Sequence, residues 1–154
     1  MAYSGDSWRD EGGSMLVGSS TRTVDPKWRI ILPREFRRDF EGWLMVTKGL
    51  DNCLYLLPMK EWDKLVEKIE AMPSGSESTR RFSRIFFANA SHLVPDGQGR
   101  ILIPTRLREM ASLNKEVVVV GLANKAEVWD PAEWEKYAAE SAGHYEQSAS
   151  DIGV

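Results

Sequence analysis

Hydrophobic residues fall along the chain in short runs whose order repeats once. Three aliphatic residues at 30–32 precede Pro33, and three at 101–103 precede Pro104. Each triplet predicts a short buried strand. Each proline predicts the end of that strand and the start of a helical turn, because proline is tolerated at the first helical position. Four further apolar runs also predict buried strands. They are 44–47, 54–57, 117–120 and 126–129.

Helical periodicity begins after the predicted strand at 54–57. One apolar stripe, at spacing i, i+3, i+4 and i+7, predicts a first helix. Ser74 and Glu77 predict a capping box for the next helix. This second helix is expected to turn Phe82, Ile85 and Phe86 toward the core. The stripe of the first helix is Trp62, Leu65, Val66 and Ile69.

A further helix is predicted after the last strand. Asp130 supplies an N-cap, Pro131 the first helical position and Glu133 a capping-box carboxylate. Residues 1–14 and 141–154 lack periodicity, and we expect both ends to be frayed.

Self-comparison shows that the chain contains two copies of one motif. Residues 25–37 match residues 96–108 at an offset of 71, with the shared pattern D-x-x-x-R, three aliphatic residues, and P-x-x-apolar-R. At an offset of 72, Gly49-Leu50 matches Gly121-Leu122, and Glu61-Trp62 matches Glu133-Trp134. One inserted residue explains the change of offset. Each D-x-x-x-R stretch predicts a turn, and the two matched glycines mark a second turn in each copy.

The repeats divide the chain into five segments. An N-terminal extension, expected to be disordered, comes first, and a helical linker joins the two domains. The predicted boundaries are 1–14 for the extension, 19–66 for the first domain, 67–90 for the linker, 91–137 for the second domain and 138–154 for a C-terminal tail.

Composition describes an ordinary globular chain, whereas local charge describes an asymmetric one. The 154 residues are 42% hydrophobic and 28% charged, with a net charge of −3 and a pI near 5.5. Taken alone, this balance argues against nucleic acid. However, residues 22–38 hold six bases against two acids, residues 77–109 six against three, and residues 127–154 one against seven. The chain can therefore present a basic face. The alternative is a set of solvated arginines paired with nearby carboxylates.

Residues for catalysis or metal binding are scarce. Cys53 is the sole cysteine, His92 and His144 lie in no catalytic motif, and no phosphate loop or metal-ligand spacing occurs. We therefore expect no enzyme, no cofactor, no metal and no small-molecule substrate. The longest apolar run falls far short of the roughly 18 residues of a membrane span. Residues 1–14 do not form a signal peptide, so a cytoplasmic location is expected.

The repeated D-x-x-x-R turn is the best candidate for a binding site. Each turn ends in an arginine, Arg29 or Arg100, that can reach out from a rigid sheet. The planar guanidinium suits phosphate oxygens and guanine in the major groove. The paired aspartate, Asp25 or Asp96, could hold that arginine in one rotamer. The alternative is a local bridge that only closes the turn. Two occurrences at equivalent positions favour a recurring surface that recognises a polymer with repeated features.

With these motifs the sequence resembles the MraZ family, small bacterial transcription regulators with two AbrB-like domains. The resemblance covers about Met15 to Tyr145, and family members tend to begin near Met15. It rests on seven ordered elements: Asp25–Arg29, Ile30–Pro33, Thr47–Asp51, Pro58–Trp62, Arg80–Phe82, Asp96–Pro104 and Glu127–Trp129.

The resemblance implies an α+β fold, with two tandem AbrB-like swapped-hairpin β domains related by pseudo-two-fold symmetry and with packing helices. It also implies a ring-like homo-oligomer, associated with the nucleoid. This ring would bind direct repeats in its own promoter and would act at the promoter of the division and cell-wall gene cluster. The family's DNA-binding motifs correspond to Asp25 with Arg29 and to Asp96 with Arg100. Lys27 and Arg22 are added from position and charge.

One position departs from the family pattern. The first motif usually reads D-x-K-G-R, and here Trp28 occupies the glycine position. If that position needs a positive φ, a bulky residue there is costly. Either the first turn takes another shape, or Trp28 contacts a partner or packs between subunits.

A rival interpretation comes from another functional class, that of protein-interaction modules such as AbrB-like antitoxins or scaffold rings. Antitoxins usually add a long toxin-wrapping tail after one AbrB-like domain. Two domains and a short tail disfavour that interpretation.

Overall fold

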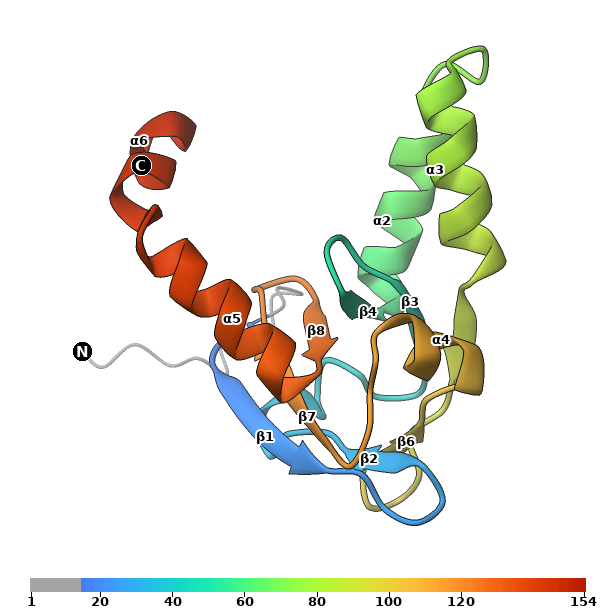
Figure 1. The fold of residues 1–154 in the computed structure, drawn as a ribbon. Coiled ribbons are helices and arrows are strands. Elements are labelled where there is room, and N and C mark those ends of the chain that lie inside the picture. Colours follow the sequence, from blue (N-terminus) through green and yellow to red (C-terminus); the bar gives the residue numbers. More distant parts are fainter. Residues whose placement is uncertain (1–14) are drawn as a thin grey trace, which may run out of the picture.

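The computed structural model describes residues 15–154 and has a mixed α+β architecture with antiparallel sheets (Figure 1). The expected N-terminal extension, residues 1–14, lies outside the described residues. The strands are β1 Ser19–Thr23, β2 Arg29–Ile31, β3 Leu44–Lys48, β4 Cys53–Pro58, β5 Ser91–Leu93, β6 Arg100–Leu102, β7 Glu116–Gly121 and β8 Ala126–Trp129. The helices are the 3-10 helix η1 Arg34–Phe36 and the α-helices α2 Met59–Glu70, α3 Glu77–Ala88, α4 Thr105–Met110, α5 Pro131–Ala142 and α6 Tyr145–Ile152. The six predicted strands are confirmed, with bounds that differ by at most one residue, and the helix predicted from the stripe at 62–69 is confirmed as α2.

The two repeats exchange strands. Six strands form one sheet in the order β1-β7-β8-β4-β3-β5, and β2 pairs with β6 in a separate two-stranded sheet. The first strand of each repeat thus pairs with the third strand of the other, β1 with β7 and β5 with β3. The order of the sheet is unchanged when the two repeats are interchanged. Neither repeat can therefore complete its own sheet.

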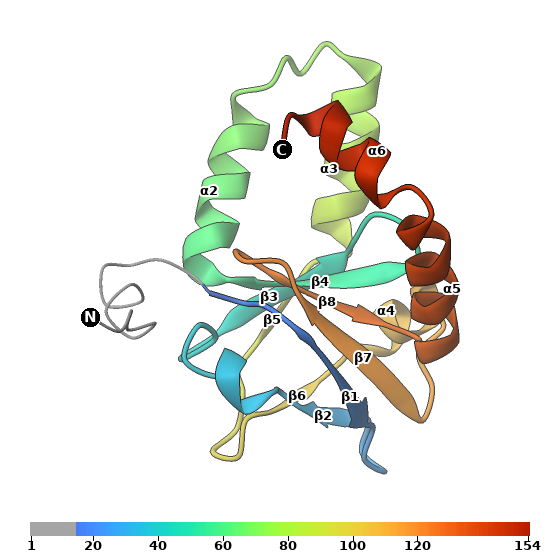
Figure 2. The same ribbon diagram turned by 90° about the vertical axis from the view of Figure 1, so that its left-hand side faces the viewer.

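The main core lies between the two sheets. Side chains alternate across a strand, so Leu54 and Leu56 face this core while Cys53, Tyr55 and Leu57 face the opposite side. The two-stranded sheet, η1 and α4 cover the core side. The two-stranded sheet lies at the end of the molecule away from α2 and α3 (Figure 2). The opposite face of the large sheet is covered in two parts, by α2 with α3 and by α5 (Figure 1).

Two predictions about α3 are wrong in detail. Its N-cap is Ser76, whose hydroxyl accepts from the Thr79 N–H, and not Ser74. Of the three side chains expected to face inward, Phe86 is buried, but Phe82 is 44% exposed and Ile85 is 55% exposed. An apolar stripe indicates which face of a helix is hydrophobic, but not how much of that face the rest of the chain covers.

The C-terminal segment is helical, contrary to the expectation of a frayed tail. α5 has the predicted Asp130 N-cap, whose carboxylate accepts from the N–H groups of Ala132 and Glu133. A further helix, α6, then ends at Gly153, which has a φ of 82°. A glycine in this conformation is a common helix C-terminus. Gly153 was therefore a local signal for the end of α6 that sequence reasoning did not use.

Candidate functional site

The first D-x-x-x-R turn is closed by hydrogen bonds to one aspartate. Asp25 Oδ1 accepts from the N–H groups of Lys27 and Arg29, at 2.9 and 2.8 Å. Asp25 Oδ2 accepts from Arg29 Nε at 2.8 Å. The aspartate therefore fixes both the backbone of the turn and the rotamer of the arginine. These hydrogen bonds, first those from the backbone and side chain of Arg29, lower the pKa of Asp25.

The second turn repeats this arrangement bond for bond. Asp96 Oδ1 accepts from the N–H groups of Gln98 and Arg100, both at 2.9 Å, and Oδ2 accepts from Arg100 Nε at 2.6 Å. The backbone hydrogen bond from Arg100, with those from its side chain and from Gln98, lowers the pKa of Asp96 to about 2. The carboxylate is thus ionised throughout the neutral range, and it binds the Arg100 guanidinium through Nε. Within residues 15–154, the Nη groups of Arg100 have no hydrogen-bond acceptor.

Antiparallel pairing of β2 with β6 brings the two arginines onto one exposed face. Arg29 lies opposite Leu102, and Ile31 opposite Arg100. Arg29 Nη1 also lies 4.0 Å from Asp96 Oδ2, so the two turns are electrostatically connected. The expectation that each aliphatic triplet is fully buried is wrong at its centre. Ile31 and Leu102 are exposed beside the arginines, because side chains alternate along a strand.

The fourth position of each turn has a left-handed backbone. Gly99 has a φ of 77° and Trp28 a φ of 63°. The first turn therefore keeps the shape of the second despite its bulky residue, and the alternative of a differently shaped turn is wrong. A non-glycine residue in this region is strained by about 1–2 kcal/mol.

An arginine from the opposite repeat covers each fourth position. The Arg108 guanidinium lies over the Trp28 ring, 4.1 Å from its centre. Arg37, which matches Arg108 in the repeat, lies against Gly99, where an added Cβ would come within 2.6 Å of Arg37 Nε. Sequence reasoning did not single out these arginines. Both arginines could have been found from the sequence, because each is the final arginine of the P-x-x-apolar-R pattern that occurs in both copies.

Lys27 and Arg22, the two DNA-binding candidates added from position and charge, occupy different environments. Lys27 is exposed within the first turn, and its backbone N–H is the group that Asp25 binds. Arg22 is half-buried on β1, opposite Val117, and β1 contacts β2. Its Nε is buried without a hydrogen-bond partner among the described residues. The structure therefore places Arg22 on a neighbouring strand and not in a turn.

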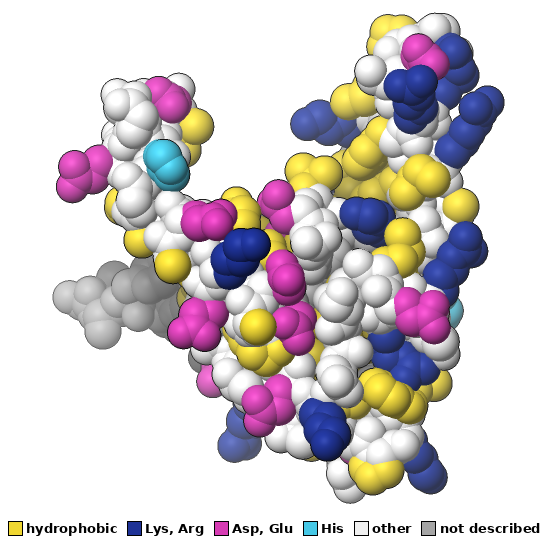
Figure 3. Space-filling view, in the orientation of Figure 1, with side chains coloured by type: hydrophobic (Ala, Val, Ile, Leu, Met, Phe, Trp, Pro, Cys, Tyr) yellow, Lys and Arg dark blue, Asp and Glu magenta, His cyan; other side chains and the backbone are white. Residues whose placement is uncertain are grey.

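The arrangement is suited to binding anions. Two aspartate-oriented guanidinium groups share a small rigid ribbon, and basic side chains lie around the same lower end of the molecule (Figure 3). Residues 15–154 contain no cluster of His, Cys, Asp and Glu that could hold a metal ion. None of the helices in that range is long and apolar enough to cross a membrane. His92, one of the two histidines, packs edge-on against Trp43 with ring centres 3.9 Å apart.

Comparison with known proteins identifies relatives over nearly the whole chain. A family model described as "MraZ protein", which the same description terms antitoxin-like, matches residues 15–85 and again residues 86–153. A protein named transcriptional regulator MraZ from Carboxydothermus hydrogenoformans is 42% identical over 138 residues, which are 90% of this chain and 96% of the relative. Its namesake from Desulforamulus reducens is 41% identical over 138 residues, 90% and 97% of the two chains. Another from Halothermothrix orenii is 42% identical over 143 residues, covering 91% of this chain and all of the relative.

Proposed function

The chain belongs to the MraZ family, with two MraZ domains in tandem, and on this premise we propose that it is a sequence-specific DNA-binding transcriptional regulator. It is not an enzyme. It acts in the cytoplasm, at the nucleoid. It binds direct repeats in its own promoter as a ring-like homo-oligomer and thereby regulates the division and cell-wall gene cluster.

One observation carries this proposal: the same aspartate-to-arginine network occurs twice, and both guanidinium groups lie on one exposed face. A side chain held in one rotamer loses little entropy when it binds, and its Nη groups can bind a phosphate or the O6 and N7 of guanine. A two-stranded ribbon can enter the major groove. Arg29 and Arg100 are the principal contacts, and Asp25 and Asp96 are positioning residues.

Neighbouring bases extend the surface toward the phosphate backbone. Lys27 lies in the first turn, and Arg22 on β1 beside β2. Contacts of this kind set affinity and orientation without reading sequence. The net charge of −3 is no obstacle, because residues 127–154 hold seven acids against one base, and α5 and α6 lie away from the end of the molecule that carries β2 and β6 (Figure 1).

The strand exchange supports a swapped-hairpin fold of the AbrB type. β1 pairs with β7 and β5 with β3, so each repeat completes the sheet of the other. The two halves are then related by a pseudo-two-fold axis between β4 and β8. This symmetry places the two D-x-x-x-R turns at equivalent positions of one surface.

A ring of such subunits suits an operator made of direct repeats. Each subunit contributes a few contacts, and simultaneous engagement of several repeats raises the avidity far above the affinity of one subunit. Repeats with a regular spacing are therefore expected to bind cooperatively.

An antitoxin-like interaction module is the second candidate, favoured by the description of the family model. Such a protein would retain a stoichiometric protein partner on purification and would not bind the promoter at low salt.

The decisive experiment is a gel shift with the native upstream region, in which the direct repeats are scrambled one at a time. Stepwise loss of binding is expected as repeats are removed. Equal binding to native and fully scrambled DNA would contradict sequence-specific regulation.

A further inference from the structure

An apolar groove with a basic rim lies at the end of the molecule remote from the two turns. It has a volume of about 680 Å³ and lies among α2, α3, β4 and the turns before β4 and β8. Its floor includes Leu50, Phe82 and Ile85, of which Leu50 is 63% exposed. Exposed side chains of this size on one concave surface mark an interaction site.

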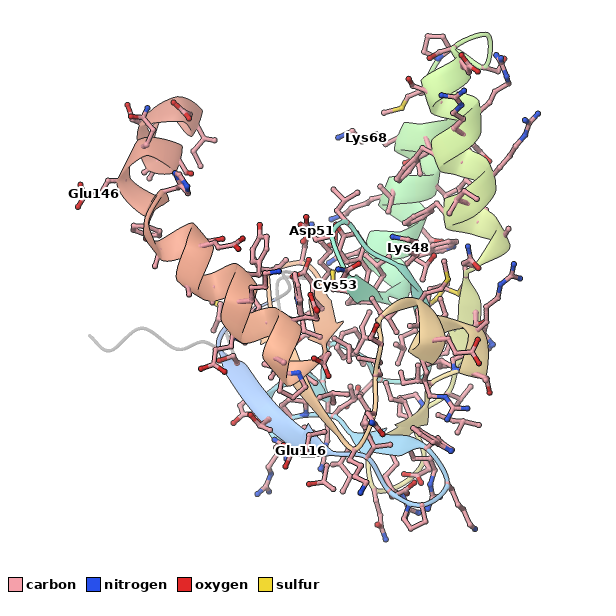
Figure 4. All side chains as sticks on the ribbon, viewed as in Figure 1. Lys48, Asp51, Cys53, Lys68, Glu116 and Glu146 are labelled. Atoms are coloured by element: carbon pink, nitrogen blue, oxygen red, sulfur yellow. The ribbon has the colours of Figure 1, made fainter. Side chains whose placement is uncertain are left out.

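The rim of this groove is almost entirely basic. It carries five bases, and Glu61 is its one acid among the lining residues. Lys64 pairs with Glu61 at 3.2 Å, whereas Lys48 and Lys68 have no carboxylate partner within the part of the chain that the structure describes. Lys68 extends from α2 toward the open side of the molecule (Figure 4). The five bases are Lys48, Lys64, Lys68, Arg81 and Lys125.

The opposite charge and further exposed apolar side chains are found on α5 and α6, which we call the C-terminal arm (131–152). Neither helix contains a buried residue. Tyr145 is 76% exposed and Ile152 is 77% exposed, and with Ala149 they form one stripe along α6. The arm carries five acids against Lys136 alone: Glu133, Glu135, Glu140, Glu146 and Asp151.

Within residues 15–154, the arm is anchored at its base. Trp134 and Tyr137 pack against Trp129 of β8, with ring centres 5.5 and 5.1 Å from it. Beyond this cluster α6 stands away from the body (Figures 1 and 3). An isolated helix shorter than about 12 residues is marginal in water, and α6 has eight residues and no side-chain N-cap. A partner surface is therefore needed to hold α6 as a helix.

The groove of the same chain is not that partner. No residue of α5 or α6 lines it, and Glu146 points away from it (Figure 4). In the first repeat, α3 packs on α2 through the stacked rings of Trp62 and Phe86, 5.7 Å apart. α5, the counterpart of α2, has no such helix packed on it within residues 15–154, because α6 leads away from the sheet.

We propose that the C-terminal arm of one copy docks in the α2–α3 groove of the next copy. The stripe of Tyr145 and Ile152 lies on the apolar floor, and the carboxylates of the arm face the lysines of the rim. This inference rests on the homo-oligomeric part of the proposed function and supplies its contact. Because arm and groove are different surfaces, the contact is head-to-tail, the type that closes into a ring when the rotation between subunits permits. The β2–β6 ribbon lies at the opposite end and remains free (Figure 2).

Charge reversal with mixing tests the contact. A groove variant carries Lys64→Glu and Lys68→Glu, and an arm variant carries Glu140→Lys and Glu146→Lys. Mass is measured by sedimentation and light scattering, and circular dichroism checks that each variant is folded. Wild type is expected to form an oligomer, and each variant alone a monomer. Lys60→Glu, on α2 but outside the groove, is the matched control and keeps the mass of the wild type.

Mixing the two variants distinguishes docking from general destabilisation. In the mixture the acidic arm of the groove variant meets the basic groove of the arm variant, and the basic arm of the arm variant meets the acidic groove of the groove variant. Both contacts are complementary, so the mixture is expected to form mixed oligomers, and high salt should weaken them. A chain with all four substitutions should assemble again. If the wild type is oligomeric and both variants have the same mass as the wild type, the docking is overturned, whereas the proposed ring is not. A mixture that stays monomeric also overturns the docking. A monomeric wild type overturns both docking and ring, while binding of promoter DNA is tested separately by gel shift.

Discussion

The guanidinium of Arg108 lies 4.1 Å from the centre of the Trp28 ring and joins the second repeat to the turn of the first. The matching Arg37 lies against Gly99 in the other turn. Each D-x-x-x-R turn is therefore covered by an arginine from the opposite repeat. A stacked guanidinium contributes about 0.5–1 kcal/mol at an exposed site. This contribution partly offsets the strain of a left-handed tryptophan.

Substitutions of Trp28 should separate ring contact from backbone strain. Trp28→Ala removes the ring but keeps a Cβ at a φ of 63°, whereas Trp28→Gly removes both. We expect the glycine variant to have a free energy of unfolding about 1 kcal/mol higher than that of the alanine variant. Urea denaturation measures both. At Trp43, exposed and without a positive φ, the order should reverse. Alanine as the more stable residue at position 28 would refute the strain.

Arg29→Ala and Arg100→Ala should each weaken discrimination for the promoter by about 1–3 kcal/mol, the usual effect of losing a bidentate base contact. Lysine at either position should retain affinity for nonspecific DNA but lose discrimination, because lysine lacks the planar fork. Fluorescence anisotropy over a range of salt concentrations measures both quantities. Lys60→Ala, on α2, serves as the control. A double alanine variant with wild-type affinity and salt slope would show that DNA binds elsewhere.

Stability should fall as Asp96 is protonated. Its pKa is lowered from 3.8 to about 2 by hydrogen bonds of the folded turn. The ionised carboxylate therefore stabilises the fold above pH 4, and this contribution is lost as the pH falls through about 2. The difference in Tm between wild type and Asp96→Asn should shrink over that window. Asp63→Asn, on the exposed side of α2, controls for the loss of a charge. A difference independent of pH would mean that Asp96 contributes through geometry alone.

Gly121→Ala should destabilise the fold although Gly121 has no positive φ. An added Cβ would lie 2.5 Å from the backbone carbon of Leu16 and the nitrogen of Val17, where the chain entering β1 crosses the end of β7. Overpacking of this kind costs about 1–3 kcal/mol. Thermal unfolding measures the loss. Gly97→Ala, with open space around its Cβ, should leave Tm nearly unchanged. An equal Tm for both variants would show that the crossing can relax.

Gly49 and Gly121 mark the β3–β4 and β7–β8 turns, as predicted. The left-handed residues of these turns are Asp51 and Ala123, with φ of 61° and 69°. The two glycines are required instead by close packing. Sequence matching found the correct positions. The need for glycine there is explained only by the residues of the same chain that pack against these positions in the folded structure.

The sequence by itself determined the features that depend on near neighbours. The D-x-x-x-R turns are local, since every hydrogen bond of Asp25 and Asp96 reaches a residue within four positions. The Asp130 N-cap is equally local. Duplication of the motif could likewise be read directly, as could the six strands with apolar runs, whose residues must leave water in any fold. β1 and β5 have no apolar run and were not predicted.

Tertiary structure alone decided how the repeats combine. Which strand pairs with β1 depends on a residue about a hundred positions away, and any of several apolar edges would satisfy the same pattern. The shared face of Arg29 and Arg100 depends on the pairing of β2 with β6. The cover of Arg108 over Trp28 and the exposure of Phe82 and Ile85 likewise depend on packing between segments far apart in the sequence. Local sequence specifies each turn, whereas long-range packing specifies the surface that the two turns make together.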